Sequence, residues 1–92
     1  MLTTRGNLNP KGYQALAVSS TAVSLTIPAG ARIAYLYVES NTVRWRDDGT
    51  NPTASVGTPL KADADLLYDS DLTKLRFIRA SADAVVHVSF YV

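Results

Sequence analysis

The sequence contains no cysteine, which excludes disulfide scaffolds, thiol catalysis and zinc–thiolate sites. Charged residues are scarce as well: they make up 18% of the chain, against about 25% in an average domain. The 9 basic and 8 acidic side chains nearly cancel, giving a net charge of +1. This balance argues against an electrostatic nucleic-acid binder. No apolar run approaches the roughly 18 residues of a spanning helix, so we expect neither a nucleic-acid nor a membrane partner.

Motifs for catalysis and cofactors are also missing. His87 is the single histidine, and no G-x-S-x-G elbow, phosphate loop, dinucleotide fingerprint or zincin motif is present. The carboxylates of Asp63, Asp65, Asp69 and Asp71 lack the spacing of a calcium loop. The last two flank Ser70 and are better interpreted as a turn between strands. We therefore predict that the protein is not an enzyme, with no catalytic, cofactor-binding or metal-binding residues.

The length and the N-terminus set the domain organisation. A chain of 92 residues makes one domain. Residues 1–12 are polar and contain Gly6, Pro10 and Gly12, which predicts a flexible N-terminal arm followed by a single domain over residues 13–92. The arm has no apolar segment of the signal-peptide type, so we expect the chain to begin in the cytoplasm where it is made, with nothing to direct it across a membrane by the standard route.

The rest of the chain has the pattern of β-strands. In the stretch AVSLTIP, apolar and polar side chains alternate with the period of two that is typical of a half-buried strand. The stretch 72–81 is less regular, and its spacing also suits one amphipathic helical turn. Seven or eight strands are predicted, and six of them can be bounded, over residues 22–27, 31–40, 42–48, 59–70, 72–81 and 84–92.

Two of these strands predict which side chains are buried. In 31–40 both faces are apolar, which indicates that the outer face is covered by a loop, by the arm or by another subunit. In 84–92 we expect Val86, Val88, Phe90 and Val92 to point inward. Seven or eight short strands without a helical period predict an all-β fold, a small antiparallel β-sandwich or barrel. A jelly-roll-like topology is the first choice and an immunoglobulin-like topology the second.

The stretch VRWRDDGTNPTASVGTPL is the densest in chemistry. Trp45 shares a strand face with Val43 and is interpreted as a core residue, which leaves Arg44 and Arg46 pointing outward. Two aspartates and Gly49 predict a turn, and the loop after it contains two prolines that favour extended, ordered backbone. Arginine is enriched at protein interfaces. The predicted interface comprises Arg44, Arg46, Asp47, Asp48, Thr50, Asn51, Pro52 and Val56, with Tyr35 and Tyr37.

Tyrosines leave a second interpretation open. Tyr35, Tyr37 and Tyr91, together with Trp45, are the side chains that suit a sugar-binding face, because their rings stack on sugars and tyrosine hydroxyls form hydrogen bonds. The sequence does not separate a protein interface from a carbohydrate-binding surface.

The stretches YQAL, AVSLTIPAGA and RWRDDGT-x-PTASVG, in this order, resemble small proteins of tailed bacteriophages and prophages. The third is the most specific, and the resemblance runs from about residue 13 to the C-terminus. It implies a virion structural protein without cofactors, with capsid decoration or cementing as the first expectation. The implied partners are the major capsid protein or other virion proteins, in a homo-oligomer for which a trimer is one arrangement. A tail, neck or baseplate component is the first alternative, and a carbohydrate-binding module that contacts the host surface is the second.

Overall fold

The computed structural model describes residues 8–92, and nearly all of their regular structure is β-strand. The all-β class is therefore confirmed. Among residues 8–92, no helix has the length and apolar composition needed to cross a membrane. The strands are β1 (Pro10–Val18), β2 (Val23–Ser24), β3 (Ile33–Ser40), β4 (Val43–Arg46), β5 (Thr58–Leu60), β6 (Asp65–Tyr68), β7 (Arg76–Arg79) and β8 (Ala84–Tyr91), with the 3-10 helix η1 (Leu72–Lys74) between β6 and β7.

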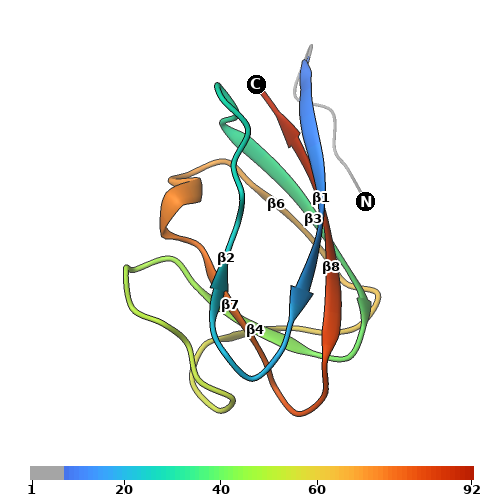
Figure 1. Ribbon diagram of the computed structural model, residues 1–92, viewed down its shortest axis with the longest axis vertical. Helices are drawn as coiled ribbons and strands as arrows, with labels where there is room; N and C mark the ends of the chain where they lie inside the picture. Colours follow the sequence, from blue (N-terminus) through green and yellow to red (C-terminus); the bar gives the residue numbers. More distant parts are fainter. Residues whose placement is uncertain (1–7) are drawn as a thin grey trace.

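The strands form two antiparallel sheets of four. Sheet A has the order β1-β8-β3-β6, and sheet B has the order β2-β7-β4-β5. Figure 1 shows them as two layers, with β1, β3 and β8 on one side and β2, β4 and β7 on the other. One hydrophobic cluster contains buried residues from both sheets. This arrangement is compatible with the predicted small β-sandwich.

Strand pairing follows a simple rule along the chain. Counting inward from both ends, β1 pairs with β8, β2 with β7, β3 with β6 and β4 with β5. The chain is thus one long antiparallel ribbon whose successive strand pairs alternate between sheet A and sheet B. The β3–β8 and β4–β7 pairs join two ribbon segments within each sheet.

Strand β3 has the two faces that its sequence predicts. Ala34, Leu36 and Val38 are fully buried, whereas Tyr35 and Tyr37 are half-buried on the outer face of sheet A. Successive side chains of a strand point to opposite faces, so the more bulky tyrosines are placed outside the core. The outer face of β3 is therefore aromatic without being part of the core.

Strand β8 confirms three of the four inward residues predicted for it. Val86, Val88 and Phe90 are buried, because β8 lies between β1 and β3 in the middle of sheet A. The prediction for Val92 is wrong, since 38% of this residue is exposed. It follows the last residue of β8, and its backbone pairs only with Asn9, so no second layer covers its side chain.

The longest strand, β1, lies before residue 22, where the first predicted strand begins. It begins at Pro10, inside the range predicted as an arm; the remaining part of that range, residues 1–7, lies outside the described residues. Leu16 and Val18 point into the core, while Ala15 and Ala17 are exposed on the other face. Pairing with β8 satisfies the backbone of this stretch even though its first half is polar.

The ambiguous stretch 72–81 contains both of the structures that its pattern allowed. Asp71 caps the short helix η1 by accepting from the Thr73 amide at 3.0 Å, and Leu72 is buried. The chain then turns into β7, in which Phe77 and Ile78 are buried. The helical spacing thus belongs to the first half of the stretch and the strand to the second half.

Candidate functional site

The turn after β4 has the geometry that its aspartates and glycine predict. Gly49 adopts a φ of 84°, and the Thr50 amide donates to the Asp48 carboxylate at 3.3 Å. Arg46 forms a two-point ion pair with Asp48, with Nε donating to Oδ1 at 3.0 Å and Nη2 to Oδ2 at 2.5 Å. The hydrogen bonds from Arg46 hold the pKa of Asp48 below its usual range. The charge of Arg46 is therefore partly compensated within its own turn.

Arg44 fastens the long loop to the outer face of sheet B. Its Nε donates to the Ala54 carbonyl at 3.0 Å, and its Nη1 donates to the Gly57 carbonyl at 2.8 Å. Within the loop, Thr53 and Val56 exchange two backbone hydrogen bonds. The loop is thus ordered, as its prolines predict, and the guanidinium group holds it against β4.

Four residues of the predicted interface line one pocket beside this loop, and they are Arg46, Asp47, Asp48 and Val56. The pocket has a volume of about 390 Å³, and the indole of Trp45 lies in its wall. Trp45 is half-buried and packs edge-on against Tyr68, with ring centroids 6.2 Å apart. Trp45 therefore contributes to the core, as predicted, and to a surface pocket as well.

The ring that packs against Trp45 is a buried phenol. Tyr68 donates to the Asp47 carboxylate at 2.8 Å. Burial raises the pKa of Tyr68, and the hydrogen bond to Asp47 raises it further. The remaining loop residues of the predicted set differ in exposure: Thr50 and Asn51 are exposed, but Pro52 is buried and presents no surface to a partner.

The two tyrosines of the predicted set lie on the opposite side of the molecule. Tyr35 donates to Asp65 at 2.9 Å, and Tyr37 donates to Asp63 at 2.7 Å. The bond to Asp63 raises the pKa of Tyr37. We call this outer surface of sheet A the tyrosine face, and it is defined by Tyr13, Tyr35, Tyr37, Glu39, Asp65 and Tyr91.

A three-residue array on the tyrosine face escaped the sequence analysis. The Tyr13 hydroxyl is hydrogen-bonded to Nδ1 of His87, and Nε2 of His87 is 2.5 Å from the Glu39 carboxylate. With a neutral imidazole, Nε2 donates to Glu39 and Nδ1 accepts from Tyr13. The array joins β1, β8 and β3 through side chains. The alternation of Tyr13 with Leu16 and Val18 was the one signal in the sequence that could have indicated it.

This array has the order of a nucleophile, a base and an acid, but not their usual setting. A base beside a hydroxyl is the geometry of nucleophilic activation. However, 61% of Tyr13 is exposed, and its ring lies parallel to the His87 ring with centroids 6.0 Å apart on an open surface. Tyr13 does not line the pocket beside the β4–β5 loop. The array orients the tyrosine ring, and we assign it a positioning role.

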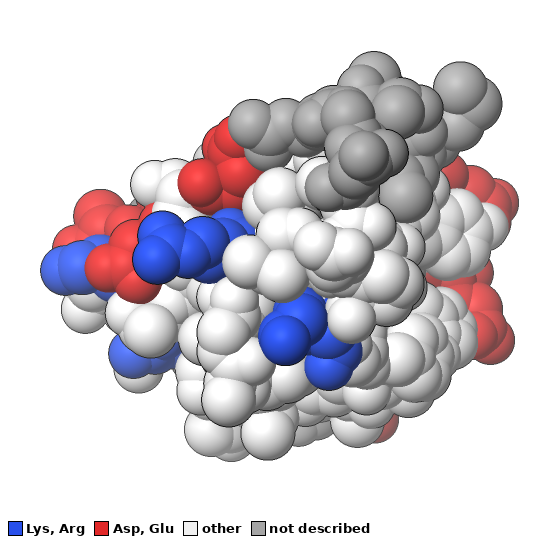
Figure 2. Space-filling view, turned by 90° about the horizontal axis from the view of Figure 1, so that it is seen from above, with Lys and Arg blue, Asp and Glu red and all other residues white. Residues whose placement is uncertain are grey.

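Charges are distributed unevenly between the two sides of the molecule. Figure 2, viewed from above Figure 1, shows basic and acidic atoms together at the left, a further basic group near the middle and acidic atoms alone along the right edge. In the part of the chain that the structure describes, no group of three or more His, Asp or Glu side chains is arranged to hold a metal ion.

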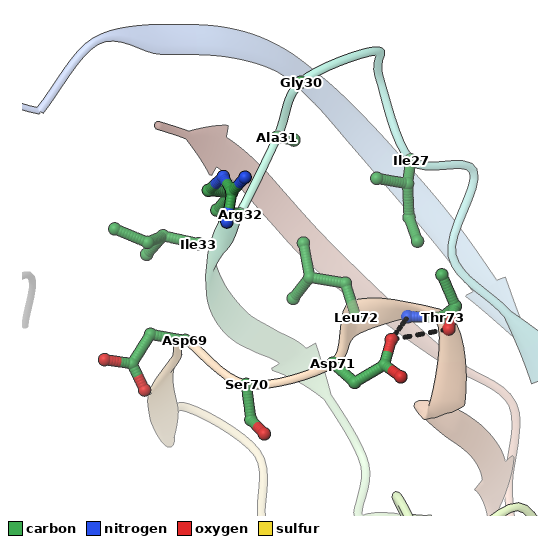
Figure 3. A pocket seen from close by; sticks show the side chains of 10 residues that line it. All are labelled: Ile27, Gly30, Ala31, Arg32, Ile33, Asp69, Ser70, Asp71, Leu72 and Thr73. Carbon is green, nitrogen blue, oxygen red and sulfur yellow. Dashed lines mark hydrogen bonds between the residues drawn. The ribbon is translucent and has the colours of Figure 1, made fainter.

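A second pocket lies at one end of the molecule, between the connection that follows β2 and the helix η1. It has a volume of about 490 Å³, with Ile27, Ile33 and Leu72 among its lining residues. Figure 3 shows the Asp71 carboxylate turned toward Thr73, whose amide and hydroxyl both donate to it. These bonds lower the pKa of Asp71. The stretch around Ser70 thus lies between two strands, β6 and β7, as predicted, and its last residue, Asp71, caps the helix η1.

Comparison of the chain with known protein families, with curated proteins and with solved structures gave no match.

Proposed function

We propose that the protein is a structural component of a bacteriophage virion, with capsid decoration or cementing as its role. Its binding partners are then the major capsid protein or other virion proteins. The proposal has two supports: the resemblance of residues 13–92 to small virion proteins, and the tyrosine face. The face is the observation that carries the proposal structurally.

The tyrosine face has the composition and rigidity of a protein-binding surface. Tyrosine is enriched at protein interfaces, where its ring provides contact area at low entropic cost. The hydroxyls of Tyr13, Tyr35 and Tyr37 are each held by an acceptor side chain, so the rings are oriented before a partner arrives. Beyond Tyr13 on the same side of β1 lie exposed small side chains, those of Ala15 and Ala17, which allow close approach.

We further propose that the two sheets form a jelly roll. A jelly roll has eight strands in two sheets connected as Greek keys. The folded ribbon, in which β1–β8 and β3–β6 lie in one sheet while β2–β7 and β4–β5 lie in the other, supports this topology over an immunoglobulin-like one. The jelly roll is a frequent fold of capsid proteins, which agrees with the proposed role.

The virion role is tested with phage particles. Mass spectrometry of purified virions is expected to detect the protein, and mild denaturant is expected to release it from otherwise intact heads. Purified protein should rebind to such stripped heads, and Tyr13→Ala should rebind more weakly than the control Thr21→Ala, which alters an exposed residue outside the tyrosine face. Absence from virions, or equal heat stability of heads with and without the protein, would refute the cement role.

Two other assignments make different predictions in the same experiments. A tail, neck or baseplate component would be found in purified tails, and labelling in electron micrographs would place it there. The carbohydrate-binding alternative is supported by the pocket at Trp45, since an indole beside an Arg46–Asp48 pair can stack on a sugar and form hydrogen bonds to its hydroxyls. Trp45 is the single tryptophan, so its fluorescence should change on titration with host polysaccharide if this pocket binds sugar.

A further inference from the structure

The outer face of sheet A carries negative charge. Glu39 and Asp65 occupy outward positions, and Asp63 lies beside them at the turn before β6. Within the described residues, the outward positions of β3, β6 and β8 that alternate with the buried core contain no lysine and no arginine, and β1 contains a single basic residue, Lys11, where its pairing with β8 is irregular. The tyrosine face is therefore acidic as well as aromatic.

The outer face of sheet B carries positive charge. Arg44 and Arg46 alternate along β4 with the inward Val43 and Trp45, and Arg46 is paired in register with Arg76 of β7. We call these three arginines the arginine face. The outward positions of the four strands of sheet B contain no Asp or Glu within the described residues.

The arginines are fixed in place, and two of them keep an uncompensated charge. Arg76 donates from Nη1 to the carbonyls of Thr73 and Leu75, at 2.8 and 3.0 Å. Arg44 likewise donates to the neutral carbonyls of the loop. Carbonyl acceptors orient a guanidinium without cancelling its charge, and of these three arginines only Arg46 is paired with a carboxylate of the described residues. The arginine face is thus a preorganised cationic surface.

These two faces match each other chemically. Arginine stacks on tyrosine rings and forms two-point hydrogen bonds with carboxylates, and tyrosine and arginine are the residues that most often dominate the binding energy of interfaces. Two tyrosine faces brought together would oppose carboxylates to carboxylates, and two arginine faces would oppose like charges in the same way. The net charge of +1 leaves little overall repulsion between copies.

We propose that copies of this protein associate head to tail, with the tyrosine face of one copy on the arginine face of the next. A heterologous contact of this kind closes into a ring or continues as a filament. The residues predicted as an interface from the sequence then form the two halves of one contact, with Tyr35 and Tyr37 on one copy and Arg44 and Arg46 on the other. This inference rests on the proposed function for its setting in a virion. It deepens the proposed function by naming one partner, a second copy of the same chain.

The first experiment measures self-association of the purified full chain by sedimentation velocity. The mean mass should rise with protein concentration at low ionic strength. Salt screens such contacts, so about 0.5 M salt should weaken the association constant by at least about tenfold. The inference is wrong if the chain stays monomeric at low salt up to a concentration of about 1 mM. A dissociation constant of that size corresponds to only about 4 kcal/mol of binding free energy.

The second experiment blocks one face at a time with side chains added to exposed positions. Ala15→Lys puts a cation on the tyrosine face opposite His87, and Ser24→Glu puts a carboxylate on the arginine face opposite Arg76. Both residues are exposed, so folding should be preserved, which thermal melts check. Matched controls are Thr21→Lys and Thr21→Glu in the exposed connection between β1 and β2.

Mixing the two blocked variants separates a head-to-tail contact from a symmetric one. Each variant alone should be monomeric, because each lacks one half of the contact. Their mixture should give dimers and nothing larger, since one intact face of each kind remains. If Ser24→Glu still self-associates like the wild type, or if the mixture stays monomeric, the head-to-tail contact is wrong. These experiments use only the isolated protein. A failure of self-association would therefore not affect the virion experiments, and absence of the protein from virions would not affect the measured self-association.

Discussion

Replacing Gly57 by alanine tests how tightly the loop is held against β4. Gly57 adopts a φ of 142°, which side chains other than that of glycine rarely accept. A β-carbon there would lie 3.0 Å from the Pro52 Cβ, 3.1 Å from the Arg44 Cβ and 3.3 Å from the Trp45 carbonyl oxygen. The substitution therefore adds a conformational cost to a steric one.

The magnitude follows from these two costs. A residue held in such a region of backbone conformation costs about 1–3 kcal/mol, and crowding a packed site costs about 1–3 kcal/mol more. We expect Gly57→Ala to lower the free energy of unfolding by about 2–6 kcal/mol. For a domain of this size each kcal/mol lowers Tm by about 4–8 °C, so calorimetry should show a fall of at least about 8 °C.

Gly49 provides the matched control. Its φ of 84° is also positive, but a β-carbon there would meet nothing within 4 Å. Gly49→Ala should therefore show the conformational cost alone, about 1–2 kcal/mol. Urea titrations of both variants, compared at equal m-values, give the difference directly. If both variants lose the same free energy of unfolding, the loop moves away from the added β-carbon at Gly57 at no cost. Arg44 then does not hold the loop firmly against β4.

Three further predictions concern the core, the loop and the turn. Phe77→Ala, at a fully buried position between the sheets, should cost about 3–5 kcal/mol in urea titrations. Arg44→Ala should speed hydrogen exchange of the Val56 amide while leaving the β8 amides protected, since it removes the two bonds to the loop. The pKa of Asp48 is lower in the folded than in the unfolded protein, because Arg46 donates hydrogen bonds to its carboxylate. The ionised carboxylate therefore stabilises the folded protein at any pH above the unfolded-state pKa, and this stabilisation is lost as the pH falls through the folded-state pKa. Asp48→Asn should therefore be less stable than the wild type at neutral pH and equal to it in strong acid, by chemical denaturation at each pH.

Alternation predicted the strands whose inner and outer sides differ clearly. In β3 and β8 every second residue from Ala34 to Val38 and from Val86 to Phe90 is buried, and the pattern survives because both strands have neighbours on each side in sheet A. Alternation was less useful at the edges. Strand β1 begins with Pro10 and polar residues and alternates clearly only in its second half, and β5 has only three residues in a loop with prolines.

Sequence periodicity predicted the correct face for Arg44 but not the destination of its side chain. Its guanidinium reaches carbonyls 10 and 13 residues further along the chain, and this depends on how the loop folds back. The Tyr13–His87–Glu39 array depends in the same way on the register of three strands, with Ala15 and Tyr37 flanking His87. The hydrophobic pattern of each strand indicates which of its faces is buried, but which residues lie opposite one another depends on the pairing of segments that are distant in the sequence.

The near-zero net charge conceals a separation of charge that the fold creates. Arg46 and Arg76 are 30 positions apart in the sequence, yet the folded ribbon pairs their strands and places both side chains on one face. Glu39 and Asp65 are brought to the opposite face by the pairing of β3 with β6 and with β8. A net charge of +1 gives little long-range attraction to a polyanion, but it is compatible with strong short-range attraction between unlike faces. For a protein of this kind the distribution of charge over the two sheets, and not its sum, decides which surfaces meet.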